Sequence, residues 1–128
     1  MIDNLIKRYP DLIGIKDELV SVVDRMEDTY KKGGKILACG NGGSCADCEH
    51  IVGELMKGFL KMRPLSQDKK NEMKNNCKLL DDDTLSKLQA ALPAISLPSI
   101  AGLNSAFCND VDPELIYAQS LISLGNKG

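Results

Sequence analysis

The sequence predicts an α/β fold built on a parallel sheet, because short apolar strands alternate with helices along the chain. Residues 35–39 and 94–97 are apolar runs too short for helices; glycines bound the first and Pro93 precedes the second. A helix is predicted after each run, at about residues 45–60 and 113–124. This strand–helix–strand–helix order requires parallel strands joined by crossover connections.

An amphipathic helix is predicted before the first strand, over residues 11–32. Its apolar side chains recur at steps of three and four residues, which places them on one face of a helix. They are Leu12, Ile15, Leu19, Val22, Val23, Met26 and Tyr30. Gly33 and Gly34 then end the helix, so residues 1–34 are predicted to form an N-terminal helical segment.

A glycine-rich loop joins the first strand to its helix within residues 35–62. Its sequence is Gly40-Asn41-Gly42-Gly43-Ser44. Glycines let the backbone approach a ligand closely, and the free N–H groups of a helix's first turn attract anions. Asn41 adds an amide, and Ser44 adds a hydroxyl at the expected N-cap. The loop therefore favours an anionic or polyol ligand, although a tight turn with an ordinary serine cap would use the same residues.

His50 and Glu54 lie four residues apart on the predicted helix and so share one face. Such a pair can ligate a divalent metal such as zinc, or act as an acid–base pair. The alternative is an exposed helical pair that contributes a few tenths of a kcal/mol. Two ligands do not close a tetrahedral zinc site, so further ligands would have to come from elsewhere.

Cys45 and Cys48 form a CxxC motif at a helix start, where a thiol pKa falls and redox chemistry becomes possible. Together with His50 they could also form a Cys/Cys/His zinc knuckle. Because the chain has no second CxxC, we interpret these cysteines as small side chains that pack the helix against the sheet. A CxxC zinc or redox module stays open as a distant alternative.

Residues 63–92 are polar and include an acidic run at 81–83, which predicts a helix or two with a solvated face and no function of its own. In residues 93–128 a second strand is followed by a helix that Asp112 caps and Pro113 begins. Asn109 and Asp110 are expected just past the carboxyl end of that strand, where open α/β sheets contact ligands. A turn would use the same two residues.

Composition excludes several classes of protein. The 128 residues include 16 basic and 18 acidic side chains, so the formal charge is −2, and aromatic residues make up 4% with no Trp. Nucleic acid is therefore not an expected partner. The most apolar stretch, residues 94–107, is too short and too polar for a membrane span, and the first residues do not resemble a signal peptide. An odd number of cysteines, five, favours a reducing compartment, so a cytoplasmic location is expected.

The motif Cys-Gly-Asn-Gly-Gly-Ser at residues 39–44, followed by His50 and Glu54, resembles the phosphoheptose isomerase (sedoheptulose 7-phosphate isomerase) family of the sugar-isomerase, or SIS, fold. Further similarity lies at residues 57–59, Arg63-Pro64, residues 91–97 and Asn109-Asp110. The resemblance covers nearly the whole chain and is least specific around residues 66–88.

The resemblance implies a three-layer α/β/α domain with a parallel sheet, assembled as a homotetramer with active sites between subunits. It implies conversion of sedoheptulose 7-phosphate to heptose 7-phosphate through an enediol, toward heptose for lipopolysaccharide and other surface polysaccharides. His50 and Glu54 would bind zinc, and Glu54 would be the base that moves a proton between C1 and C2. The substrate contacts it implies are Asn41, Gly42, Gly43, Ser44, Glu54, Asn109 and Asp110.

Features of the family's C-terminal part are missing from this sequence. They are a Ser/Thr-rich phosphate loop after a third strand, and the Gln and second His of a C-terminal helix. Residues 1–128 are therefore expected to be the N-terminal portion of a single SIS domain, incomplete at its C-terminus and inactive without the rest. The alternative is a non-catalytic SIS module that acts as a sugar-phosphate sensor or a protein-binding regulator.

Overall fold

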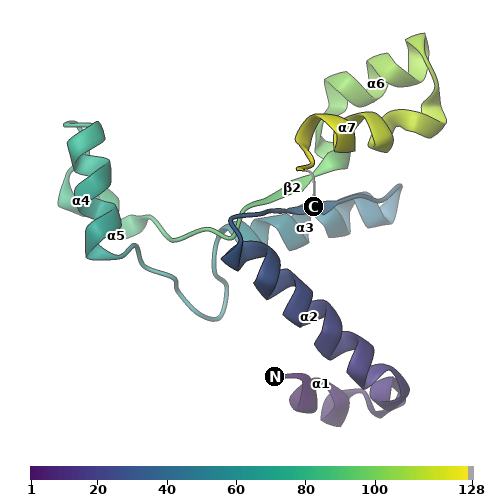
Figure 1. The fold of residues 1–128 in the computed structure, drawn as a ribbon, viewed down its shortest axis with the longest axis horizontal. Coiled ribbons are helices and arrows are strands. Elements are labelled where there is room, and N and C mark those ends of the chain that lie inside the picture. The colour runs from purple at the N-terminus through teal and green to yellow at the C-terminus, as the bar shows by residue number, and fades with distance from the viewer. Residues whose placement is uncertain (127–128) are drawn as a thin grey trace. The chain divides into compact units, whose positions relative to one another are not determined.

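The computed structural model describes residues 1–126, which divide into two compact units at Ile36 (Figure 1). The first unit contains three helical elements: α1 (Ile2–Arg8), the 3-10 helix η1 (Pro10–Ile15) and α2 (Lys16–Lys31). The single helix expected over 11–32 is therefore divided, and α1 was not predicted. Pro10 at the start of η1 has no N–H to continue a helix from α1, and the Lys16–Asp3 ion pair of 2.7 Å joins α2 to α1.

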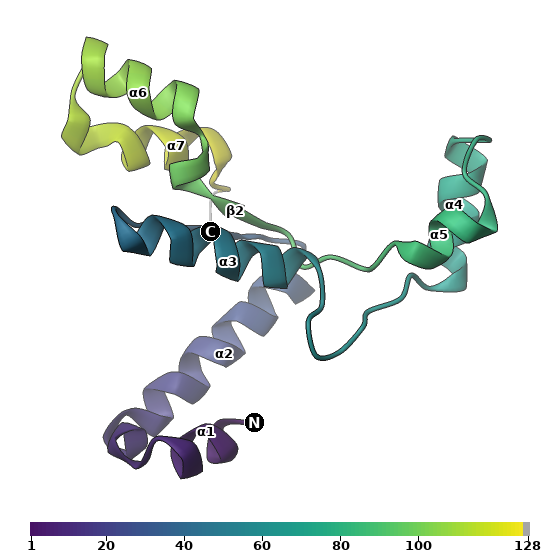
Figure 2. The ribbon, with the colours of Figure 1, turned by 180° about the vertical axis from the view of Figure 1, so that it is seen from behind.

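The second unit is built on a two-stranded parallel sheet, which confirms the predicted α/β class. Strand β1 (Ile36–Ala38) pairs with β2 (Ala94–Ser96), within the two ranges predicted for strands. Helix α3 (Gly43–Met56) packs on β2, and Figures 1 and 2 show the two elements side by side. The buried apolar side chains of these two elements are Cys48 and Val52 on α3 and Ala94 on β2.

Helix α3 begins two residues earlier and ends four residues earlier than expected. Its N-cap is Gly42, so the prediction that Ser44 caps the helix is wrong: Ser44 lies inside the first turn. The helix ends at Met56 because Lys57 is extended and the next residue, Gly58, is buried against the carbonyl of Lys61. A side chain at position 58 would collide with that carbonyl, so the chain must leave the helix here.

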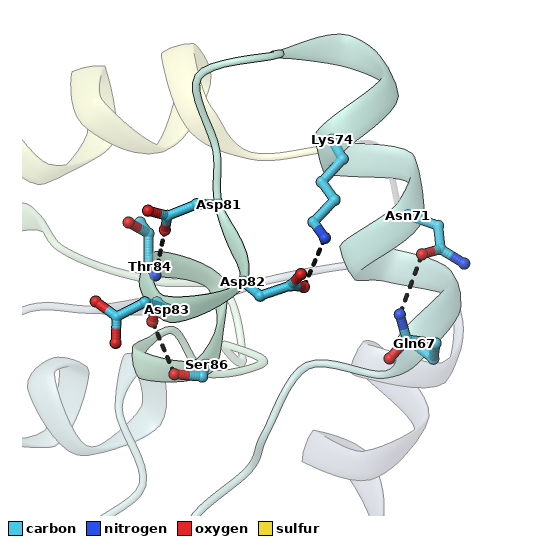
Figure 3. A network of polar contacts seen from close by, with 8 residues as sticks. All are labelled: Gln67, Asn71, Lys74, Asp81, Asp82, Asp83, Thr84 and Ser86. Carbon is cyan, nitrogen blue, oxygen red and sulfur yellow. Dashed lines mark hydrogen bonds and ion pairs between the residues drawn. The ribbon is translucent and has the colours of Figure 1, made fainter.

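The polar segment of residues 63–92 contains two helices, α4 (Gln67–Asn76) and α5 (Asp82–Lys87), in agreement with the prediction of one or two helices there. Both helices have side-chain N-caps, because Ser66 Oγ accepts from the Lys69 N–H and Asp81 Oδ1 accepts from the Thr84 N–H. Figure 3 shows the second of these caps together with the ion pair between Lys74 and Asp82 that joins the two helices. The amide of Thr84 also lowers the pKa of Asp81, which keeps the cap ionised.

The chain then folds back through a helical hairpin. After β2 come the 3-10 helix η2 (Leu97–Ser99), α6 (Ala101–Asp110), the 3-10 helix η3 (Pro113–Leu115) and α7 (Ile116–Leu124). Figures 1 and 2 show α6 and α7 lying side by side. The predicted start of the last helix is confirmed, because Asp112 Oδ1 accepts from the Glu114 N–H at 2.8 Å and Pro113 follows the cap.

Helix α6 was not predicted, and its presence corrects the placement of Asn109 and Asp110. These two residues end α6, a whole helix beyond β2, and do not directly follow the strand. The bounds of the predicted segments within one SIS domain stay a prediction. Across residues 1–126 every helix is too short or too polar to cross a bilayer.

Candidate functional site

The glycine-rich loop connects β1 to α3, and the start of the helix is exposed to solvent there. Gly42 has φ 58° and ψ −125°, a conformation in which a side chain would be strained. The loop is closed by two backbone hydrogen bonds, from the Ser44 N–H to the Asn41 carbonyl (3.2 Å) and from the Cys45 N–H to the Gly42 carbonyl (3.1 Å). Residues 41–44 are all exposed. The loop is therefore open to solvent at the start of α3, although the Ser44 and Cys45 N–H groups already have partners within the loop. Its role as a ligand site stays a prediction.

Gly40 is required because the backbone approaches closely at the start of this loop. A Cβ at position 40 would lie 2.7 Å from the Cβ of Ser44 and 2.9 Å from its carbonyl oxygen. The helix backbone on that side cannot move away without breaking the first turn. Glycines 40 and 42 thus fix the loop for different reasons, the first for space and the second for its dihedral angle.

The His50–Glu54 pair lies on one exposed face of α3, as predicted. His50 Nε2 is 3.0 Å from Glu54 Oε1, and the two side chains are 75% and 51% exposed. This distance fits an Nε2–H group that donates to the carboxylate. About half of the Glu54 side chain is exposed among the described residues, so a substrate can reach the carboxylate.

The same pair offers donors of the kinds that zinc binds, an imidazole nitrogen and a carboxylate oxygen. Two atoms bound at the usual distances to a tetrahedral zinc ion are about 3.3 Å apart, close to the 3.0 Å between Nε2 and Oε1. The two residues therefore fit one side of a zinc site once Nε2 has no proton. Within residues 1–126 no cluster of three potential ligands is present, so this pair has no third partner there.

The loop and the Glu54 carboxylate lie at opposite ends of α3. Gly43 begins the helix and Glu54 follows eleven residues later, which corresponds to about 16 Å along the helix axis. A seven-carbon sugar phosphate is shorter than this distance. This value separates the two backbones, and the Glu54 side chain leans back toward the N-terminus of the helix. The assignment of the loop and Glu54 to one site stays a prediction.

Asn109 and Asp110 form a local pair at the end of α6. The Asn109 Nδ2 group donates to Asp110 Oδ1 at 2.8 Å, and both residues are exposed. No hydrogen bond within residues 1–126 links them to the loop or to the His50–Glu54 pair. Their role as substrate contacts stays a prediction.

Tyr117 contacts the loop and was missed by the sequence analysis. Its hydroxyl is 2.8 Å from the carbonyl oxygen of Gly40 and 2.7 Å from Oδ1 of Asn41. Burial raises the pKa of Tyr117, so the hydroxyl keeps its proton at neutral pH and can donate it. No local pattern marks this residue, because the contact depends on α7 returning to a loop more than 70 residues earlier.

One of the cysteines near the loop, Cys48, is a packing residue. Cys48 is buried on the face of α3 that packs on β2, which is the packing position that the sequence suggested. Burial raises the pKa of the Cys48 thiol, and the neighbouring Cys39 and Cys45 add to the effect. Cys48 therefore has the properties of a packing residue, and the CxxC zinc or redox alternative stays untested.

Comparison with known proteins identifies the kind of domain to which these residues belong. A family model described as "SIS domain" matches residues 13–88, more than half of the chain, including the loop and the His50–Glu54 pair. The chain is similar to a protein named phosphoheptose isomerase from Roseiflexus sp., 30% identical over 110 residues, which cover 86% of this chain and 43% of the relative.

Two further relatives have the same printed name. The phosphoheptose isomerase of Desulfovibrio desulfuricans is 33% identical over 81% of this chain and 37% of its own length. That of Nitratidesulfovibrio vulgaris is 31% identical over 90% of this chain and 43% of its own length. The chain thus spans less than half the length of each of these three relatives.

Proposed function

Because the chain belongs to the SIS domain family, we propose that it contributes to a sugar-phosphate isomerase that converts sedoheptulose 7-phosphate to heptose 7-phosphate. The observation that carries the proposal is the exposed Glu54 carboxylate, whose Oε1 lies 3.0 Å from Nε2 of His50. Both residues lie on α3, which begins directly after the glycine-rich loop. Glu54 is the base: it takes a proton from the carbon next to the carbonyl and returns it to the neighbouring carbon through an enediol. The relatives' printed names support this substrate.

The loop is the proposed site for the anionic or hydroxyl-rich part of the substrate. Asn41 offers its side-chain amide, and the loop lies at the positive end of the α3 helix dipole, which favours a negatively charged group. Ser44 adds a hydroxyl within the same turn. Asn109 and Asp110 are proposed as further sugar contacts on the basis of the family resemblance.

We further propose that the site is completed by groups from another part of the protein or from another copy of the chain. The His50–Glu54 pair supports this, because it has no third potential metal ligand beside it within residues 1–126. Large apolar side chains near the end of α3 are exposed and available for such a contact. They are Ile51, Met56, Phe59, Leu60 and Met62.

A homotetramer, as the family resemblance implies, is our proposal for the assembly. A cytoplasmic location is also proposed, since all five cysteines are free within the described residues and the substrate is a phosphorylated metabolite. The product would supply heptose for surface polysaccharides.

The proposal is tested with the protein at the full length that its gene encodes, incubated with sedoheptulose 7-phosphate in D₂O and followed by NMR. The expected result is appearance of the aldose with deuterium at C2, because the transferred proton exchanges with solvent at the base. Binding of the sugar phosphate without turnover would favour the sensor or regulator alternative. The absence of both binding and turnover would overturn the proposal.

We also propose that His50 and Glu54 bind a zinc ion. When bound, zinc would polarise the substrate carbonyl. We expect His50→Ala to lower zinc affinity at least about tenfold, since even outer-shell ligand partners are worth 10- to 100-fold. The measurement is the metal content of protein equilibrated with buffered zinc.

The matched control for the zinc experiment is the double variant Cys45→Ser, Cys48→Ser on the same helix. It is expected to keep the zinc affinity of the unaltered protein. The opposite pattern, with zinc lost in the cysteine variant and kept in His50→Ala, would instead support the CxxC module.

A further inference from the structure

Tyr117 lies where it can fix the conformation of the glycine-rich loop. Its hydroxyl contacts the Gly40 carbonyl at 2.8 Å and the Asn41 side chain at 2.7 Å, so one oxygen atom bridges the backbone and the side chain of successive loop residues. A phenol has one hydrogen, so it donates to one of these oxygens at a time. Both contacts have the length of good O–H···O hydrogen bonds.

The position of Tyr117 within α7 is itself well defined. Tyr117 is half-buried in the first turn of α7, directly after the turn that Asp112 caps. Three residues further on, Ser120 is fully buried, and its hydroxyl donates to the carbonyl of Ile116 at 3.1 Å. Both features fix Tyr117 within its own helix, and the buried Ser120 places one face of that helix in the protein interior.

The loop, in contrast, has little else to hold Asn41. Asn41 is exposed, and the glycines on both sides of it have no side chains to pack. Its backbone carbonyl accepts from the Ser44 N–H at the long distance of 3.2 Å. Without Tyr117, the Asn41 amide would rotate freely, and the Gly40 carbonyl would lose its side-chain donor.

We propose that Tyr117 is a positioning residue, which holds Gly40 and Asn41 so that the Asn41 amide and the first turn of α3 face a phosphorylated sugar. The ligand class rests on the proposed function, whereas the positioning of the loop rests on the two contacts alone. Tyr117 acts through Asn41 and has no contact with the reacting carbons. It therefore affects substrate binding and leaves the proton transfer at Glu54 unchanged.

The test replaces one oxygen atom, with Tyr117→Phe. Loss of one hydrogen bond corresponds to about a 2- to 10-fold change in an equilibrium, so KM for the sugar phosphate is expected to rise by this factor with kcat within about twofold. Backbone amide exchange at Ser44 and Cys45, measured without any ligand, is expected to accelerate by a similar factor. The control is Tyr9→Phe, which removes the hydroxyl of a half-exposed tyrosine in the first unit.

A double-mutant cycle distinguishes positioning from general support of the fold. In an Asn41→Ala background, Tyr117→Phe is expected to raise KM by less than about twofold, because the side chain through which it acts is gone. Full additivity of the two changes would overturn the proposal, as would unchanged amide exchange in Tyr117→Phe. Faster exchange in a protein that turns over no sugar phosphate would support the positioning of the loop and contradict the proposed function.

Discussion

Glu54→Gln is expected to lower kcat for sugar-phosphate isomerisation by about 10²–10⁴-fold, the usual contribution of a positioned general base. The carboxamide keeps the size of the side chain but cannot accept the proton that the enediol mechanism removes. Because the amide oxygen can still accept a hydrogen bond from His50, whose Nε2 is 3.0 Å from the carboxylate, KM is expected to change much less. Exchange of the C1 proton of the ketose with D₂O should fall in parallel with turnover.

Glu49→Gln is the matched control for this experiment. Glu49 is an exposed glutamate of the same helix, and its carboxylate accepts one hydrogen bond, from Ser99 Oγ at 3.0 Å. Its replacement is expected to change kcat by less than about twofold. Equal losses in both variants would contradict a specific base at position 54. A physiological role that survives Glu54→Ala would favour the sensor or regulator.

The features that the sequence predicted correctly are those set by neighbouring residues. Both strands lie within their apolar runs, and Asp112 with Pro113 begins the last helical segment as expected. A cap depends on one side chain and an amide two or three residues away. The His50–Glu54 pair follows in the same way from the pitch of a helix.

The features that it did not predict depend on residues that are distant in the chain or weak as local signals. Helix α6 has Gly102, Asn104 and Ser105, which are poor helix formers, in a stretch for which no helix or strand was predicted. Asn104 instead stabilises the start of this helix, because its Nδ2 group donates to the carbonyls of Leu97 and Pro98. The glycine cap of α3 depends on the backbone dihedral angles of Gly42. The Tyr117 contact depends on α7 returning to a loop far earlier in the chain.

Arg63 is the residue whose loss should most weaken the second unit. Its guanidinium donates to the carbonyls of Leu55 (2.6 Å) and Glu54 (3.3 Å) at the end of α3, and to that of Ala90 (3.0 Å) before β2. The backbone repeats the connection, since the Ala90 N–H donates to the Arg63 carbonyl and the Leu92 N–H donates to the Leu55 carbonyl. One side chain thus joins the helix that carries Glu54 to the segment that leads into the sheet.

Arg63→Ala is therefore expected to destabilise this junction by about 2–3 kcal/mol, because a hydrogen bond from a charged donor contributes about 1.5–3 kcal/mol and only the bond to Leu55 is partly buried. The amides of Ala90 and Leu92 should then exchange with solvent about 30- to 150-fold faster. Native-state hydrogen exchange measures this locally.

Lys61→Ala, in the same connection but at an exposed position, is the control for Arg63→Ala and should leave both amides unchanged. Arg63→Lys should recover less than half of the loss, because an ammonium group cannot reproduce the planar fork that reaches two chain segments together. Full recovery by lysine would show that positive charge near the negative end of the α3 dipole is sufficient. In that case the geometry of the guanidinium would not be what holds Glu54 to the sheet.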